Sequence, residues 1–173
     1  LLIPNNLKDY HNYFSSFNVK GIILTGGNNV DPQRYNSESD LADVYPERDK
    51  TEEILFNYAI DKKIPILGVC RGFHYINILL GGRLTHNING HVKVYHRLVS
   101  DNSDYNNTEV NSYHNQGVKP NQLSTKLKCV ACTEDGFVEV YKSNASNILG
   151  FQWHPERDFQ EFDSNLIKKH FSI

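Results

Sequence analysis

The sequence predicts an α/β domain with a mostly parallel central sheet and a small antiparallel extension. The first two thirds of the chain alternate short β-branched runs with helical patterns, and this alternation is typical of parallel βαβ units. The last third instead contains short strand-like runs separated by turns, which favours antiparallel pairing. A length of 173 residues, without a repeat or a long linker, fits one domain over residues 1–173.

The first two thirds contain four predicted elements. Residues 19–24 and 64–69 are short apolar runs that indicate buried strands, and the first run ends at Gly26 and Gly27. A second helix over residues 72–80 should end at the glycine pair 81–82. Before it, residues 49–61 form an amphipathic helix, whose predicted apolar face comprises Ile54, Leu55, Tyr58 and Ala59.

The last third contains four short predicted strands, at residues 109–111, 127–131, 137–141 and 148–153. Asp135 and Gly136 between two of them form a typical hairpin turn. A helix over residues 163–171 should close the domain, with Asp163 or Ser164 as its N-cap and a basic last turn. Two polar, irregular segments, 36–48 and 87–107, are expected to border the functional site, because such insertions follow strand ends.

Composition gives no support for several classes of partner. The net charge of -2, from 18 basic and 20 acidic side chains, offers no electrostatic case for nucleic acid or an anionic membrane surface. No apolar run approaches the roughly 18 residues of a membrane span. Three cysteines do not make a disulfide framework, so a reducing, cytoplasmic setting is expected. The chain lacks methionine and opens on a strand-like Leu-Leu-Ile-Pro, so we expect an N-terminal piece to be missing.

The strongest chemical motif is Gly68-Val69-Cys70-Arg71-Gly72, between a predicted strand and a predicted helix. Two glycines allow a sharp turn, so the cysteine can project above the sheet as in a nucleophile elbow. A helix N-terminus beneath the cysteine favours the thiolate and offers backbone N–H groups to an oxyanion. The alternative is a buried structural cysteine between two glycines. The strand–turn–helix context favours the nucleophile.

A second motif, Gln152-Trp153-His154-Pro155-Glu156, supplies a base and a carboxylate. Residues two apart in extended chain share a face, so Glu156 can orient the imidazole of His154 to take a proton from sulfur. Alone, such a motif is more often an incidental ion pair in a solvated loop. Together with the Cys70 elbow, it predicts a catalytic triad of Cys70, His154 and Glu156.

Two further segments are candidates for binding. Gly26 and Gly27 bring bare backbone N–H groups to the end of a strand, where an oxyanion hole is needed, although a simple turn has the same sequence. Residues 111–116 (N-S-Y-H-N-Q) concentrate donors and acceptors that could hold the α-amino and α-carboxylate groups of an amino acid. An ordinary polar surface loop explains that segment equally well.

No metal site is predicted. His86, His91, His96 and His114 have spacings that match no metal-ligand pattern. Cys129 and Cys132 have a redox or zinc spacing, but strand residues three apart face opposite sides. We therefore interpret them as ordinary sheet cysteines.

These motifs, in this order, resemble the class I glutamine amidotransferase-like family, and most closely its stand-alone γ-glutamyl hydrolases, typified by γ-glutamyl-γ-aminobutyrate hydrolase. The resemblance covers nearly the whole chain. The Cys-Arg-Gly elbow and the V-D-P turn favour the hydrolase branch over the synthetase-coupled enzymes. It rests on residues 21–32, Glu47-Arg48-Asp49, residues 64–72, Asn111-Ser112 with His114, Asp135-Gly136 and residues 150–156.

The resemblance implies a three-layer sandwich and a cysteine-dependent hydrolase without cofactor or metal. By the family pattern, Cys70 attacks a γ-glutamyl carbonyl and the amides of Gly27 and Arg71 hold the oxyanion. His154 protonates the leaving amine, and water releases L-glutamate from a thioester. The implied substrate-binding residues are His74, Ser112, Tyr113, His114 and Gln116. The family fold also begins with a strand and a helix that this chain lacks before Leu1.

One departure from the family bears on the substrate. The family commonly has glutamine four residues after the nucleophile, and His74 stands there in this chain. The small molecule expected is therefore a γ-glutamyl amine or a γ-glutamyl nucleotide phosphoramidate, since a related branch cleaves the latter. A homodimer is compatible with this reading. Two alternatives stay open: a glutaminase subunit that passes ammonia to a synthetase partner, and an inactive binding module.

Overall fold

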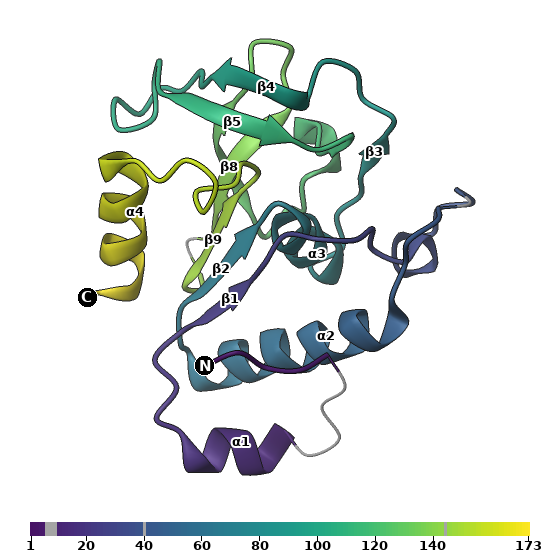
Figure 1. Cartoon of the computed structure of the whole chain (residues 1–173), viewed down its shortest axis with the longest axis vertical. Helices are drawn as coiled ribbons and strands as arrows, with labels where there is room; N and C mark the ends of the chain where they lie inside the picture. Colours follow the sequence, from purple (N-terminus) through teal and green to yellow (C-terminus); the bar gives the residue numbers. More distant parts are fainter. Residues whose placement is uncertain (6–9, 40, 144) are drawn as a thin grey trace.

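A five-stranded sheet forms the centre of the computed structural model, which describes residues 1–5, 10–39, 41–143 and 145–173 (Figure 1). The strand order is β1-β2-β9-β8-β7. β1, β2 and β9 pair in parallel, whereas β8 pairs antiparallel with both β9 and β7. The predicted α/β class is confirmed, and the sheet is mixed. The strands are β1 Ile22–Leu24, β2 Ile66–Val69, β7 Lys128–Cys132, β8 Val138–Lys142 and β9 Ile148–Phe151.

Side-chain alternation along the sheet divides the core into two layers. Ile66 of β2 packs on one face with helices α1 (Tyr10–Ser16), α2 (Pro46–Lys62) and α3 (Arg71–Leu79). Leu67 and Val69 pack on the other face, where apolar residues of α4 (Glu161–Phe171) join them. Helices therefore cover both faces, as a three-layer sandwich requires.

A hairpin of β4 (Val92–Arg97) and β5 (Glu109–Tyr113) lies beyond one end of the central sheet (Figure 1). The interpretation of residues 87–107 as irregular is wrong for the part that forms β4. A bulge between Val92 and Val94, with φ 58° at Lys93, breaks the alternation that marks a strand in sequence. Short elements complete the connections: β3 (Thr85–His86), β6 (Gln116–Gly117), and the 3₁₀ helices η1 (Pro32–Tyr35) and η2 (Pro120–Gln122).

Several helix bounds differ from the prediction. α1 was not predicted, and α2 begins at Pro46, where a proline suits the first helical position. Phe56 of α2 is buried in place of Ile54. α4 begins at Glu161 with Gln160 as N-cap, so the assignment of Asp163 or Ser164 as N-cap is wrong. Asp163 instead accepts a hydrogen bond from the Gln160 backbone N–H at 3.0 Å.

The prediction that Cys129 and Cys132 face opposite sides is also wrong. Their sulfur atoms lie 3.3 Å apart as free thiols. The pairing of β7 with β8 shifts register on either side of Ala131, so the simple two-residue alternation does not hold there.

Among the residues that the structure describes, no helix is long and apolar enough to cross a membrane.

Of the two segments expected to border the site, 36–48 includes residue 40, which lies outside the described ranges. Within this segment, residues 36–39 follow η1, and Val44 forms an isolated parallel bridge with Asn29.

Candidate active site

The carboxyl ends of three parallel strands bring the predicted catalytic segments together. β1 leads into residues 25–27, β2 leads into Cys70, and β9 leads into residues 152–154. A Cβ atom built on Gly26 would lie 2.7 Å from Cε1 of His154 and 3.7 Å from Cβ of Cys70. The three segments are therefore in contact at one edge of the sheet, where open α/β sheets place their ligands.

Cys70 occupies a strained backbone conformation at the turn between β2 and α3. Its φ is 50° and its ψ is -100°, a region that side chains other than glycine rarely adopt. The turn also needs its two glycines. A Cβ on Gly68 would lie 2.6 Å from the Gly72 carbonyl oxygen, and one on Gly72 would lie 2.1 Å from the Leu24 carbonyl oxygen. This geometry is that of a nucleophile elbow.

Burial of Cys70 favours the neutral form of its thiol. Burial raises its pKa to about 12, and the nearby carboxylates of Glu156 and Glu139 act in the same direction. The backbone N–H of Arg71 donates a hydrogen bond to the sulfur and lowers the pKa, but by less than burial raises it. The helix N-terminus therefore acts on the thiol in the expected direction, but burial outweighs it. A nucleophilic role for Cys70 would need a base to take the thiol proton.

His154 is positioned to be that base. Its Nδ1 lies 2.6 Å from Oε1 of Glu156, so in the neutral ring Nδ1 carries the proton and Nε2 carries the lone pair. His154 is buried, whereas the Glu156 carboxylate is 59% exposed. Within the described residues, no hydrogen bond joins the Cys70 thiol to His154; such contacts often tighten only when substrate is bound.

Asn111 of β5 holds the backbone of His154. Its Oδ1 accepts a hydrogen bond from the His154 backbone N–H at 3.0 Å, and its Nδ2 donates to the His154 carbonyl at 2.8 Å. All of these groups are buried. Sequence reasoning placed Asn111 in a polar cluster without this role, because no local signal links it to a residue so distant in sequence.

The predicted oxyanion hole is buttressed by Arg48 on the side of Gly27. The Arg48 guanidinium donates to the carbonyl oxygens of Thr25 and Gly26 at 2.9 Å and 3.0 Å, and to Oδ1 of Asn28 at 2.9 Å. Gly27 has a φ of 145°, and a Cβ there would lie 2.2 Å from Nη1 of Arg48. Glycine is therefore required, and the loop is fixed with its backbone exposed toward the strand edge.

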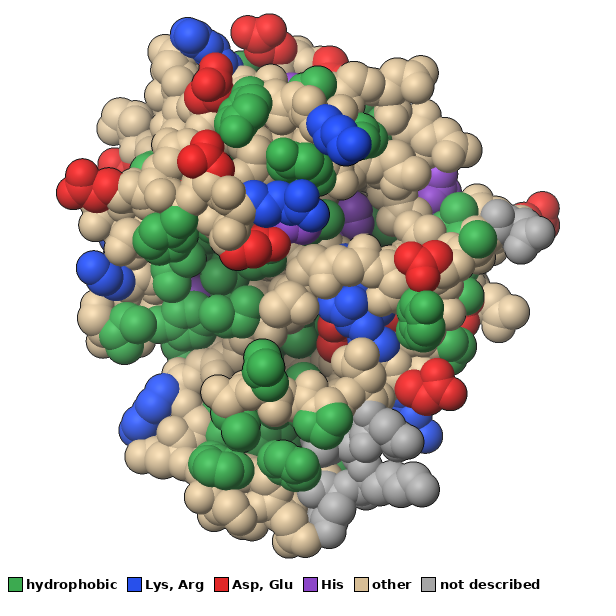
Figure 2. Space-filling view, in the orientation of Figure 1, with side chains coloured by type: hydrophobic (Ala, Val, Ile, Leu, Met, Phe, Trp, Pro, Cys, Tyr) green, Lys and Arg blue, Asp and Glu red, His purple; other side chains and the backbone are tan. Residues whose placement is uncertain are grey.

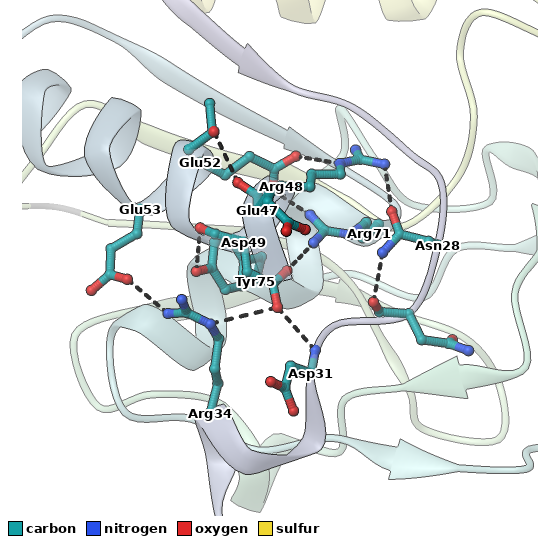
Figure 3. Close-up of polar contacts among 12 residues, drawn as sticks. Asn28, Asp31, Arg34, Glu47, Arg48, Asp49, Glu52, Glu53, Arg71 and Tyr75 are labelled. Atoms are coloured by element: carbon teal, nitrogen blue, oxygen red, sulfur yellow. Dashed lines mark hydrogen bonds and ion pairs between the residues drawn. The ribbon is translucent and has the colours of Figure 1, made fainter. Parts of the chain in front are cut away.

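The side chain of Arg71 takes part in a buried ion network (Figure 3). Its guanidinium binds the carboxylates of Asp49 and Glu52 in α2. The guanidinium carbon, Cζ of Arg71, lies 5.3 Å from the ring centre of Tyr75. Burial raises the pKa of Asp49, and Arg71 opposes that rise. The Glu47-Arg48-Asp49 motif thus has a structural basis: Arg48 fixes one side of the predicted oxyanion hole, and Asp49 anchors the residue that supplies the other.

The predicted substrate-binding residues lie in different settings. Tyr113 meets His154 edge to face, with ring centres 6.1 Å apart, and His74 is buried one turn after Cys70 in α3. The other three have internal partners. Ser112 donates to the His91 carbonyl at 2.7 Å, Nε2 of Gln116 lies 3.0 Å from Nδ1 of His86, and Nδ1 of His114 lies 2.7 Å from the Gln116 carbonyl.

A cavity of about 540 Å³ adjoins His154, the predicted catalytic histidine. It is bordered by Gly26, Gly27, His154 and Glu156 on one side and by apolar residues of β1, β2 and α4 on the other. Figure 2 shows hydrophobic side chains gathered in this region, with acidic and basic side chains interspersed over the rest of that face. His154 and Glu156 are therefore accessible from a partly apolar cavity.

Comparisons with known proteins identify the family of the chain. Residues 1–156 match the family model described as Peptidase C26. The chain is 35% identical over 162 residues to a candidate glutamine amidotransferase of Schizosaccharomyces pombe, covering 80% of this chain and 62% of that protein, and thus less than two thirds of the relative's length. It is 31% identical over 176 residues to the γ-glutamyl-γ-aminobutyrate hydrolase of Escherichia coli O157:H7, covering 86% and 68% of the two chains.

Two further similarities concern a second substrate class and the fold. The γ-glutamyl-CDP-amidate hydrolase of Campylobacter jejuni is 27% identical over 158 residues, covering 90% of this chain and 71% of that protein. The crystal structure of a glutamine amidotransferase from Thermotoga maritima aligns with a TM-score of 0.56 at 18% identity, covering 86% and 84% of the two chains. At that identity the structural match supports the fold alone.

Proposed function

The chain belongs to the peptidase C26 family of class I glutamine amidotransferase-like proteins, and from that premise we propose that it hydrolyses a γ-glutamyl amide bond through a cysteine thioester. The observation that carries this proposal is the strained Cys70 elbow in contact with the segment that holds His154 and Glu156. A nucleophile, a base and an orienting carboxylate at one strand edge are the parts that covalent acyl transfer needs.

The reaction proceeds in two halves. Nε2 of His154 takes the thiol proton as the Cys70 sulfur bonds to the γ-carbonyl carbon, and the backbone amides of Gly27 and Arg71 hold the oxyanion. His154 then gives the proton to the amine nitrogen as the carbon–nitrogen bond breaks. Water loses a proton to His154 as it attacks the thioester carbon. The carbon–sulfur bond then breaks to release glutamate, and His154 returns the proton to the sulfur, which restores the thiol and the neutral base.

The leaving group that we propose first is an alkyl amine such as γ-aminobutyrate. The 31% identity to the Escherichia coli hydrolase over most of both chains supports it. A γ-glutamyl nucleotide phosphoramidate is the second candidate, because the Campylobacter jejuni relative aligns over 90% of this chain. His74 lies beside the elbow and is the residue that we expect to distinguish these substrates from plain glutamine.

Glutamate release from a panel of substrates tests the proposal. The panel contains glutamine, γ-glutamyl-γ-aminobutyrate, other γ-glutamyl amines and a γ-glutamyl phosphoramidate, with Cys70→Ala as the inactive control. We expect cleavage of a compound other than glutamine. Cleavage of glutamine alone would favour a glutaminase subunit with a synthetase partner. No cleavage of any compound by the folded protein would overturn the hydrolase assignment and favour a binding module.

A further inference from the structure

A group of buried polar side chains lies outside the proposed triad. His91 precedes β4, His114 follows β5, and Glu139 lies in β8. All three are buried, and one potential ligand atom from each lies within 4.8 Å of the others. Linear spacing gave no sign of this group, because its members come from three separate segments of the chain.

The buried atoms that face one another in this group lack hydrogen-bond partners. They are Nδ1 of His91, Nε2 of His114 and both carboxylate oxygens of Glu139. The contact between Nε2 of His114 and Oε1 of Glu139 is 3.5 Å long. A buried carboxylate without any hydrogen bond is costly. A bound cation would remove that cost.

The far side of each imidazole is held so that the lone pair faces the group. Nε2 of His91 lies 3.0 Å from Oδ2 of Asp135, and Nδ1 of His114 lies 2.7 Å from the Gln116 carbonyl oxygen. A neutral ring that donates from one nitrogen carries its lone pair on the other. A carboxylate or carbonyl partner on the outer nitrogen is the usual arrangement behind a metal-bound histidine.

From this geometry we propose that His91, His114 and Glu139 form a binding site for a divalent transition-metal ion, specifically zinc. Two imidazoles and one carboxylate are a ligand set that zinc uses in proteins. Zinc bonds of about 2.0–2.2 Å would separate neighbouring ligand atoms by about 3.3 Å, close to the spacing of the His114–Glu139 pair. The ligand set contains no thiol, so the site is distinct from the cysteines.

His96 of β4 lies beside the three proposed ligands. Its ring centre lies 4.4 Å from that of His91, and its Nε2 is buried without a partner. A surface hollow of about 490 Å³, bordered by His91, His96 and Asp135, offers an entry path.

The metal would fasten the β4–β5 hairpin to the central sheet. Two ligands come from the ends of the hairpin and one from β8. The same hairpin carries Asn111, which holds His154, and the backbone of Glu139 accepts a hydrogen bond from Gln152 two residues before His154. The role that we assign to the ion is structural, and it replaces the substrate-binding role predicted for His114.

The test measures zinc binding by the protein after a chelator has removed bound metal. Competition with a chromophoric zinc indicator gives the affinity. We expect one zinc per chain and a higher melting temperature with zinc, since an ion that binds only the folded state stabilises it. Glu139→Gln should weaken zinc binding by more than tenfold, and Asp135→Asn by about 10–100-fold through His91. Glu134→Gln is the matched control, because this exposed neighbour undergoes the same change and should bind zinc normally.

Cobalt substitution separates this site from the thiols. We expect a cobalt spectrum without thiolate charge-transfer bands, unchanged in a Cys129→Ser, Cys132→Ser variant and in Cys70→Ala. Bands that disappear in either cysteine variant would overturn the proposal. A wild-type protein that binds no zinc would also overturn it. If, in addition, Glu139→Gln raises KM for the γ-glutamyl substrate, Glu139 serves the substrate instead. The zinc stoichiometry and the expected absence of thiolate bands are measured on the wild-type chain and do not depend on the folding of any variant.

Discussion

Asn111 of β5 and His154, three residues after the end of β9, are joined by two hydrogen bonds, one in each direction. The amide of Asn111 accepts from the His154 backbone N–H at 3.0 Å and donates to the His154 carbonyl at 2.8 Å. The peptide groups that carry the proposed base are thereby tied to the β4–β5 hairpin rather than to their own sheet.

Replacing Asn111 should therefore affect both stability and rate. Asn111→Ala leaves a buried N–H and a buried carbonyl without partners, and we expect it to cost about 1–3 kcal/mol of unfolding free energy. A displaced imidazole should lower kcat by up to about 10²-fold. Urea unfolding and glutamate-release kinetics measure the two effects. Asn115→Ala, the same change at an exposed neighbour, is the control, and equal behaviour of the two variants would contradict the role of Asn111.

Glu156 should matter for rate and hardly for stability. Its carboxylate holds Nδ1 of His154 at 2.6 Å but is 59% exposed. We expect Glu156→Gln to lower kcat by about 10²–10⁴-fold, because the tautomer that presents Nε2 as the base is lost. The unfolding free energy should change by no more than about 0.5 kcal/mol. Glu161→Gln at an exposed helix position controls for the loss of charge, and full activity in Glu156→Gln would exclude the triad.

The ion network around Arg71 should behave in the opposite way. Asp49→Asn leaves part of the buried Arg71 charge unpaired, and we expect a loss of about 3–5 kcal/mol of unfolding free energy in urea. Glu53→Gln is the matched comparison. It breaks only the half-exposed pair with Arg34, which should contribute about 0–1 kcal/mol. If the two variants lose equal stability, the buried network does not hold the segment that carries Arg71.

His74 should make stability depend on pH. Burial lowers its pKa from 6.5 to about 3, with the nearby His114 as a smaller cause. Between these values the unfolded chain binds a proton that the folded chain does not, so stability should fall as pH drops from 6.5 toward 3. The slope from this residue is at most about 1.4 kcal/mol per pH unit. Urea unfolding at several pH values should show a flatter dependence for His74→Gln; an unchanged slope would contradict a buried neutral His74.

Local sequence signals were sufficient for some features and not for others. The sequence predicts the Cys70 elbow and the His154–Glu156 pair because each motif consists of a few residues that are close together in sequence. Strand pairing then explains their meeting, since β2 and β9 are neighbours. Contacts between distant segments, such as Asn111 with His154 or Arg71 with Asp49, leave no local pattern.

Backbone irregularities account for the errors in the sheet. A strand is recognised by its two-residue alternation, and one extra residue in a bulge reverses that alternation. The bulge near Lys93 interrupts the alternation by which β4 could be recognised in the sequence. The register shifts around Ala131 bring Cys129 and Cys132 to the same side of the strand. α1 is only seven residues long and carries no acidic first turn or basic last turn to mark its ends.

The unusual backbone of Cys70 has a consequence for how the protein is monitored during folding. A φ of 50° with a ψ of -100° is maintained only while β2, β9 and the loop after β1 enclose the turn. An unfolded or half-assembled chain carries an ordinary thiol with relaxed dihedral angles. The geometry of the proposed nucleophile therefore depends on the pairing of β2 with β1 and β9, and catalytic activity would report that these distant strands have come together.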